Sequence, residues 1–175
     1  MNKVQLTHRE ATDFAARQTA ANSTCILHRS CRVLTMTGEV SVEELSPDSR
    51  LITRDKGAQP LLNVQRVTGA LPMLELAISP LIAKKSDDTM PITHDTLVLV
   101  RDTRIISCFG LKEAFVRAED IEPCESSDSS QDFWELNFGS AQVLYVNDLE
   151  IGTSFTEAEQ QSRPVLTRNQ AQLLF

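Results

Sequence analysis

GEVSVEELSPDSRLITRDKGAQPLLNV (residues 38–64) is the stretch that decides the fold of this chain. Short runs of aliphatic residues alternate in it with turn-forming Gly, Pro, Asp and Ser. Val40 and Val42 alternate with polar neighbours, which is typical of a half-buried strand. Together with the residues before it, the stretch predicts one strand pair around the turn 37–39 and another around the turn 55–57. Local signals therefore favour β-hairpins.

Strand-like patterns continue through the rest of the chain. They predict a strand over 71–78, an apolar hairpin over 96–107 that turns at Asp102, a short strand and helical turn over 111–121, and further strands over 133–155. Two polar stretches, SDDTMP (86–91) and ESSDSSQD (125–132), are expected to be loops. The predicted fold class is all-β.

Short helices are expected at the two ends of the sequence. Thr7 and Glu10 fit a capping box at the start of a helix within residues 1–24. The last residues, 167–175, are expected to form a second helix whose Leu173, Leu174 and Phe175 dock on the body. This divides the chain into an N-terminal helix or leader (1–24) and a β domain (25–175).

Composition limits the classes of partner. The 175 residues are 41% apolar and 23% charged, which suits one globular domain. The net charge of −7 argues against nucleic acid or an anionic membrane surface as the main partner, because both require clustered Lys and Arg. The sequence has no apolar run long enough to cross a bilayer and no N-terminal signal peptide, so a cytoplasmic location is expected.

Common cofactor and catalytic motifs are absent from the sequence. There is no GxGxxG or GxxxxGK[ST] phosphate loop, no GxSxG and no HExxH. The sequence therefore implies no cofactor.

The four cysteines (Cys25, Cys31, Cys108 and Cys124) are widely spaced, which favours free thiols in a reducing compartment. CILHRSC places Cys25, His28 and Cys31 three residues apart, so a metal site is an alternative. Zinc requires three or four converging ligands, and no second Cys/His pair accompanies this one, although His94 could add a ligand. Buried thiols without a metal are the favoured interpretation.

Residues 38–64 resemble the opening of the Hint domain, the module shared by inteins and Hedgehog autoprocessing domains. The bacterial branch reads G-x-x-P-V-E-x-L-x-x-G-D-x-V-L-T-R-D-x-G-x-Q-P-V. Residues that keep its order and spacing are Val42, Glu43, Leu45, Leu51, Thr53, Arg54, Asp55, Gly57, Gln59 and Pro60. Later blocks at 108–121, 133–155 and 163–175 are also similar, so the resemblance covers about residues 25–175.

The resemblance implies a flattened, horseshoe-like all-β fold and a self-cleavage chemistry. In active members, a cysteine at the start of the domain attacks the preceding carbonyl and forms a thioester. This N-to-S shift requires a nucleophilic thiol, a proton donor for the leaving nitrogen and hydrogen bonds to the oxyanion. A [S/T]-x-x-H block just before an apolar strand supplies the last two.

The nucleophile implied by this resemblance is Cys25, with Thr24–Cys25 as the cleaved junction. The family motif is C-F-x-x-G-T, whereas ILHRS follows Cys25 here. Gapless alignment places Ile26, not Cys25, on the cysteine position. A structural cysteine is therefore the favoured alternative, and Cys31 lies too far into the first strand to replace it.

The histidine block maps onto residues 93–96. Thr93 falls on the hydroxyl position and Thr96 on the histidine, whose proton transfer near neutral pH a threonine cannot perform. His94 lies two residues earlier, and a small register shift could place it in the site. Two further histidines of the branch fall on Glu135 and Ala141.

Three functions follow from these comparisons of residues. The first is a degenerate Hint domain that keeps its fold for a structural or binding role with a protein partner. The second is an active autoprocessing domain that cleaves at Thr24–Cys25. The third is a metal-binding module. Protein splicing is the least favoured activity, because the C-terminus lacks the His-Asn pair of inteins.

Overall fold

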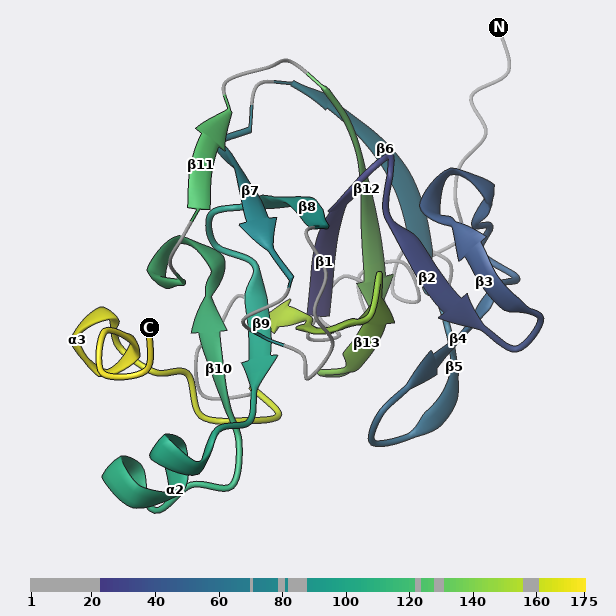
Figure 1. Cartoon of the computed structure of the whole chain (residues 1–175). Coiled ribbons are helices and arrows are strands. Elements are labelled where there is room, and N and C mark those ends of the chain that lie inside the picture. Colours follow the sequence, from purple (N-terminus) through teal and green to yellow (C-terminus); the bar gives the residue numbers. More distant parts are fainter. Residues whose placement is uncertain are drawn as a thin grey trace, which may run out of the picture.

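The computed structural model describes residues 23–69, 71–78, 81, 88–121, 124–127, 131–155 and 161–175. Strands dominate these residues, and they form three antiparallel sheets (Figure 1). The prediction of an all-β fold is thereby confirmed. The helix predicted over 1–24 lies outside the described residues except for Ser23 and Thr24, which belong to the first strand.

The first sheet has the order β15-β1-β12-β6. Its strands are β1 (Ser23–His28), β6 (Asn63–Gly69), β12 (Gln131–Phe138) and β15 (Ser154–Phe155). β1 runs antiparallel to β12 along its whole length, and its first two residues also pair with β15. The first two residues of β1 are therefore paired on both sides.

The second sheet has the order β10-β9-β14-β13-β2-β4-β5, and β3 pairs with β2 beside this path. Its strands are β2 (Arg32–Thr35), β3 (Gly38–Ser41), β4 (Arg50–Thr53), β5 (Gly57–Pro60), β9 (Leu97–Val100), β10 (Ala114–Arg117), β13 (Val143–Val146) and β14 (Leu149–Gly152). The hairpins β2–β3 and β4–β5 are the two that residues 38–64 predicted.

The third sheet has the order β11-β7-β8, with β7 (Met73–Ala77), β8 (Thr89–Thr93) and β11 (Cys124–Ser127). β8 also lies against β1 of the first sheet. Because β8 leads through a short turn into β9, this segment joins the third sheet to the second next to β1.

Aliphatic side chains fill the core. Leu27, Val33, Leu136 and Leu144 are buried members of the main cluster, which also contains Cys25. A smaller cluster surrounds the fully buried ring of Phe115 between β9, β10 and β13. Removal of this apolar surface from water is the main stabilising contribution to the fold.

The hairpin predicted over 96–107 is wrong. Residues Thr103–Phe109 form the helix α2, and β9 pairs instead with β10 (Figure 1). The side chain of Asp102 accepts a hydrogen bond from the backbone N–H of Arg104 at 2.7 Å, which caps the helix. Gly110 ends it with a left-handed φ of +67°. The apolar residues of α2 had strand-like composition, but local capping favours a helix.

Both predicted polar loops contain strand. β8 begins at Thr89 because Met90 is fully buried against the partner strand β7. β11 covers 124–127, and β12 begins at Gln131. Backbone pairing with other strands decided these segments against their composition.

The predicted C-terminal helix is confirmed as α3 (Arg168–Ala171). Thr167 and Gln170 form a capping box at its start. Leu174 is buried, but Leu173 is 60% exposed, so the expectation that all three terminal apolar residues dock is wrong for Leu173.

Two 3-10 turns, η1 (Val42–Glu44) and η2 (Ala118–Asp120), complete the elements used below. Among the described residues, no helix has the length and apolar character that crossing a bilayer requires.

Candidate functional site

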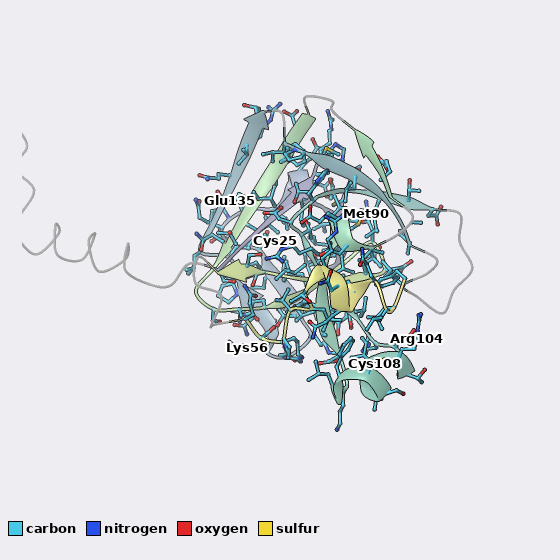
Figure 2. The ribbon with its side chains drawn as sticks, turned by 90° about the vertical axis from the view of Figure 1, so that its left-hand side faces the viewer. Cys25, Lys56, Met90, Arg104, Cys108 and Glu135 are labelled. Carbon is cyan, nitrogen blue, oxygen red and sulfur yellow. The ribbon has the colours of Figure 1, made fainter. Side chains whose placement is uncertain are left out.

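Cys25 lies in β1 opposite Leu136 of β12 and is only 5% exposed. Figure 2 shows it among the side chains at the centre of the molecule, whereas Cys108 lies on α2 at the edge. Burial raises the pKa of the Cys25 thiol far above its ordinary value, and the nearby Cys31 and Asp95 raise it further. The thiol is therefore protonated at neutral pH and a poor nucleophile.

A small cavity of about 60 Å³ adjoins Cys25. Its lining comes from β1, the β8–β9 turn, the end of β14 and the start of β15. The lining residues are Thr24, Cys25, Ile26, Thr93, Asp95, Thr96, Gly152 and Ser154. The structure thus brings the predicted nucleophile Cys25 together with Thr93 and Thr96, and the space beside them is large enough for only a few water molecules.

The hydroxyls of Thr93 and Thr96 form a hydrogen bond of 2.7 Å, and both residues are buried. The turn between β8 and β9 creates this geometry, because the Thr96 N–H donates to the Thr93 carbonyl at 3.1 Å. Thr93 Oγ1 also donates to Asp95 Oδ1 at 2.9 Å. Since each hydroxyl has one proton, Thr96 must be the donor to Thr93. The chain of bonds runs Thr96 to Thr93 to Asp95.

His94 faces away from this chain of bonds. Its Nδ1 lies 3.9 Å from Glu119 Oε2 on η2. Both backbone polar groups of His94 form hydrogen bonds: its N–H donates to Pro72 O, and its carbonyl accepts from the Glu119 N–H. Among the described residues that line the cavity there is no histidine.

A family model of the Hint domain matches residues 24–159. The chain belongs to the Hint-domain family. The matched region contains both Cys25 and the Thr93–Thr96 turn.

One comparison with a solved structure supports the Hint fold. A bacterial intein-like domain from Clostridium thermocellum superposes with a TM-score of 0.53 at 12% identity, over 74% of this chain and 98% of that chain. The class 3 split intein AceL NrdHF, in a glutathione-linked, splice-inactive variant, gives a TM-score of 0.48 at 11% identity, over 75% and 98% of the two chains. A search of curated proteins gave no match. The horseshoe-like all-β Hint fold that the sequence predicted is confirmed.

Two of the possible metal ligands of this Hint domain, Cys31 and His28, make contacts with other groups. Cys31 is 1% exposed, its Sγ lies 4.0 Å from Pro91 O, and burial raises its pKa to about 12. His28 Nδ1 is within hydrogen-bond distance of Ser30 Oγ at 2.8 Å, and its ring packs edge-on against Phe133. Across the described part of the chain, no three His, Cys, Asp or Glu side chains gather closely enough to hold a metal ion.

Glu135 and Ala141, which align in sequence with two later histidines of the branch, lie elsewhere in the structure. Glu135 pairs across the sheet with Ile26, and its carboxylate accepts a hydrogen bond from Gln65 Nε2. Ala141 is half-buried and has only a methyl group. Neither residue lines the cavity beside Cys25.

Sequence reasoning missed two residues that line the cavity beside Cys25. Asp95 lies within the block 93–96 and had no expected role, but the turn between β8 and β9 brings its carboxylate to Thr93. Gly152 is distant in sequence, and a Cβ at this residue would lie 2.5 Å from Phe115 Cζ. Only the pairing of β14 with β9 brings it to the cavity.

Proposed function

We propose that this protein is a Hint domain that keeps the fold for a binding or structural role and has lost self-cleavage. The observation that carries the proposal is the hydrogen bond between Thr96, at the histidine position of the family, and Thr93. A hydroxyl in a Thr–Thr–Asp chain does not take up and release protons near neutral pH as an imidazole does. In this proposal residues 25–175 are the Hint domain, and residues 1–24 precede it.

The environment of the Cys25 thiol supports the same conclusion. An N-to-S shift requires a thiolate, or a thiol with an adjacent base, and a proton donor for the departing nitrogen. Burial raises the pKa of Cys25, and the carboxylate of Asp95 raises it further because it repels a thiolate. Asp95 also accepts the Thr93 hydrogen bond. The resting arrangement therefore disfavours both the attacking and the leaving step.

The Thr24–Cys25 peptide is constrained by strand pairing. Thr24 pairs with Asn137 of β12 on one side and with Ser154 of β15 on the other. Twisting this peptide away from planarity, which would activate its carbonyl, requires loss of pairing in β1. Two-sided pairing thus suits a structural strand better than a scissile junction.

A second candidate function is self-cleavage at Thr24–Cys25. It is favoured by one observation, that Cys25, Thr93 and Asp95 line the same cavity. In this alternative, the side chain of Asp95 would take the place of the histidine that the family uses as proton donor.

Intact-mass measurement separates the two functions. The full chain is incubated with dithiothreitol, with hydroxylamine and with neither, and its mass is followed over time. We expect an unchanged mass in all three conditions. The proposal would be overturned by a loss of the first 24 residues that requires thiol or hydroxylamine and that does not occur in the Cys25→Ala variant.

Matched variants control this measurement. Cys108→Ala removes an exposed thiol outside the cavity and is expected to behave as the parent chain. Asp95→Asn removes the carboxyl that the alternative requires. Cleavage that survives in Cys108→Ala and disappears in Asp95→Asn would establish the self-cleaving function.

A further inference from the structure

A second and larger hollow lies on the surface beside the β2–β3 hairpin. It has a volume of about 390 Å³ and opens between that hairpin, η1 and the loop that enters β4. We call it the hairpin groove. Its lining residues are Thr35, Met36, Thr37, Val40, Glu44, Ser46, Asp48, Ser49 and Arg50, none of which lines the Cys25 cavity.

The walls of the hairpin groove are held by hydrogen bonds of their own. Thr35 Oγ1 donates to Gly38 O at 2.8 Å and fixes the hairpin turn. The N–H of Ser46 donates to Ser49 Oγ at 3.0 Å and fixes the opposite loop. The Met36 N–H donates to Arg50 O at 3.2 Å and ties the two walls together. The groove is therefore formed before any partner binds.

Two carboxylates in the groove lack partners. Among the described residues, Glu44 and Asp48 have neither an ion pair nor a hydrogen bond to their side chains, and both are exposed. Neighbouring acidic groups differ, because Glu43 pairs with Arg29 at 3.5 Å. Arg50 is the basic residue in the groove lining, and its side chain donates a hydrogen bond to Ala58 O at 3.1 Å. The hairpin groove thus presents net negative charge that the protein does not neutralise.

Apolar surface lies beside these carboxylates. Met36 is 64% exposed, the largest exposed fraction among the exposed large hydrophobic residues of the described chain, and Val40 is half-buried. A methionine side chain adapts its shape to different apolar partners. The groove therefore combines the carboxylates of Glu44 and Asp48 with an apolar surface that contains the adaptable side chain of Met36.

We propose that the hairpin groove binds an extended peptide segment of another protein in which a Lys or Arg is adjacent to an aliphatic residue. The basic side chain pairs with Glu44 and Asp48, and the aliphatic one covers Met36 and Val40. Charge complementarity points to this partner, since the unpaired groups are anionic and the chain has a net charge of −7. The inference goes beyond the proposed function and does not depend on the loss of self-cleavage.

Fluorescence anisotropy tests the proposal with a defined probe. The probe is a fluorescein-labelled peptide, Gly-Lys-Leu-Lys-Leu-Gly, titrated with the full chain, and Gly-Gln-Leu-Gln-Leu-Gly is the uncharged comparison. We expect the lysine peptide to bind, and to bind more weakly as salt is raised to about 0.15 M, because exposed ion pairs are screened. The glutamine peptide is expected to bind at least about tenfold more weakly.

Variants locate the binding. Glu44→Gln with Asp48→Asn is expected to weaken binding by about tenfold, the sum of two exposed ion pairs. Met36→Ser is expected to weaken it by about threefold or more through lost apolar contact. The matched control is Glu43→Gln, which removes one charge from the same 3-10 turn at a residue outside the groove and should change binding by less than about twofold.

Four results would each overturn the proposal. The first is no binding of the lysine peptide at about 1 mM protein, and the second is binding of the glutamine peptide as tight as that of the lysine peptide. The third is binding of the lysine peptide by the Glu44/Asp48 variant as tight as by the parent chain. The fourth is displacement of the lysine peptide by spermidine at the same concentration of positive charge. The last result would assign the groove to small cations. Thermal unfolding of each variant verifies that it is folded, so that a loss of binding reports on the groove alone.

Discussion

The hydroxyl oxygens of Thr93 and Thr96 lie 2.7 Å apart across the turn between β8 and β9. This turn lines the same cavity as Cys25. By sequence, Thr93 and Thr96 fall on the hydroxyl and histidine positions of the Hint family, and the loss of the proton-transfer group is part of the proposed function. Thr93 and Thr96 form part of the polar wall of a small cavity beside Cys25.

The hydrogen bond between these threonines should stabilise the fold. Thr96→Val keeps the side-chain shape and removes the donor, while Thr93 retains its bond to Asp95. We expect the free energy of unfolding to fall by about 1 kcal/mol, measured by urea denaturation. Thr68→Val, at an exposed residue of β6, is the control and should change it by less than about 0.5 kcal/mol. No loss in Thr96→Val would show that the bond contributes nothing.

The thiols should differ strongly in reactivity. Burial raises the pKa of Cys25 and Cys31, the latter to about 12, so at pH 8 their thiolate fractions are very small. Cys108 is exposed on α2. In a time course with iodoacetamide, peptide mapping should find Cys108 alkylated before Cys25 and Cys31, with Cys25 protected until denaturant is added. Alkylation of Cys25 at the rate of Cys108 would contradict the buried, protonated thiol.

Gly152 should not tolerate a side chain. A Cβ there would lie 2.5 Å from Cζ and 2.6 Å from Cε1 of the fully buried Phe115 ring. Gly152→Ala is expected to lower the free energy of unfolding by about 1–3 kcal/mol through overpacking. The control is Gly69→Ala in β6, where nothing lies within 4 Å of the added carbon. Equal stabilities of the two variants would disprove this role for Gly152.

Glu150 joins two arginines and should contribute to stability. Its Oε2 accepts from Arg54 at 2.7 Å and from Arg101 at 2.5 Å, and its side chain is only 11% exposed. We expect Glu150→Gln to lower the free energy of unfolding, measured by thermal or urea unfolding, by about 1–2 kcal/mol. The loss is limited to this size because Arg54 keeps its bond to Glu113. The exposed pair of Arg29 and Glu43 provides the comparison, because Glu43→Gln should cost less than about 0.5 kcal/mol.

Asp102 should make the stability of α2 depend on acid pH. Its hydrogen bonds with Arg104 lower the pKa of its carboxyl to about 2. Because the folded pKa lies below the unfolded value of about 3.9, the stabilisation is complete above about pH 4 and is lost as the pH falls through about 2. NMR titration of the Arg104 amide should show this midpoint. A midpoint near 4 would mean that the cap does not favour the ionised carboxylate.

How much of the fold was predictable depends on the range of the interactions involved. The hairpins β2–β3 and β4–β5 follow from local turn chemistry, since Gly38 and Gly57 supply positive φ values of +108° and +66°. Helix α2 was predicted as a strand because its capping by Asp102 was read as a hairpin turn. The strand β11 was missed because its pairing with β7 is about fifty residues distant in sequence.

For the site, the sequence determined which residue types align with the family's positions, and this alignment puts Thr96 where the family has histidine. It also indicated Cys25 as the nearest thiol to the start of the domain. Only the tertiary structure decided where these groups point: Thr93, Thr96 and Asp95 towards the cavity beside Cys25, and His94 towards Glu119. The physical reason is that residue identity and turn spacing are local properties. Burial, pKa and side-chain direction depend instead on strands brought together from distant parts of the chain.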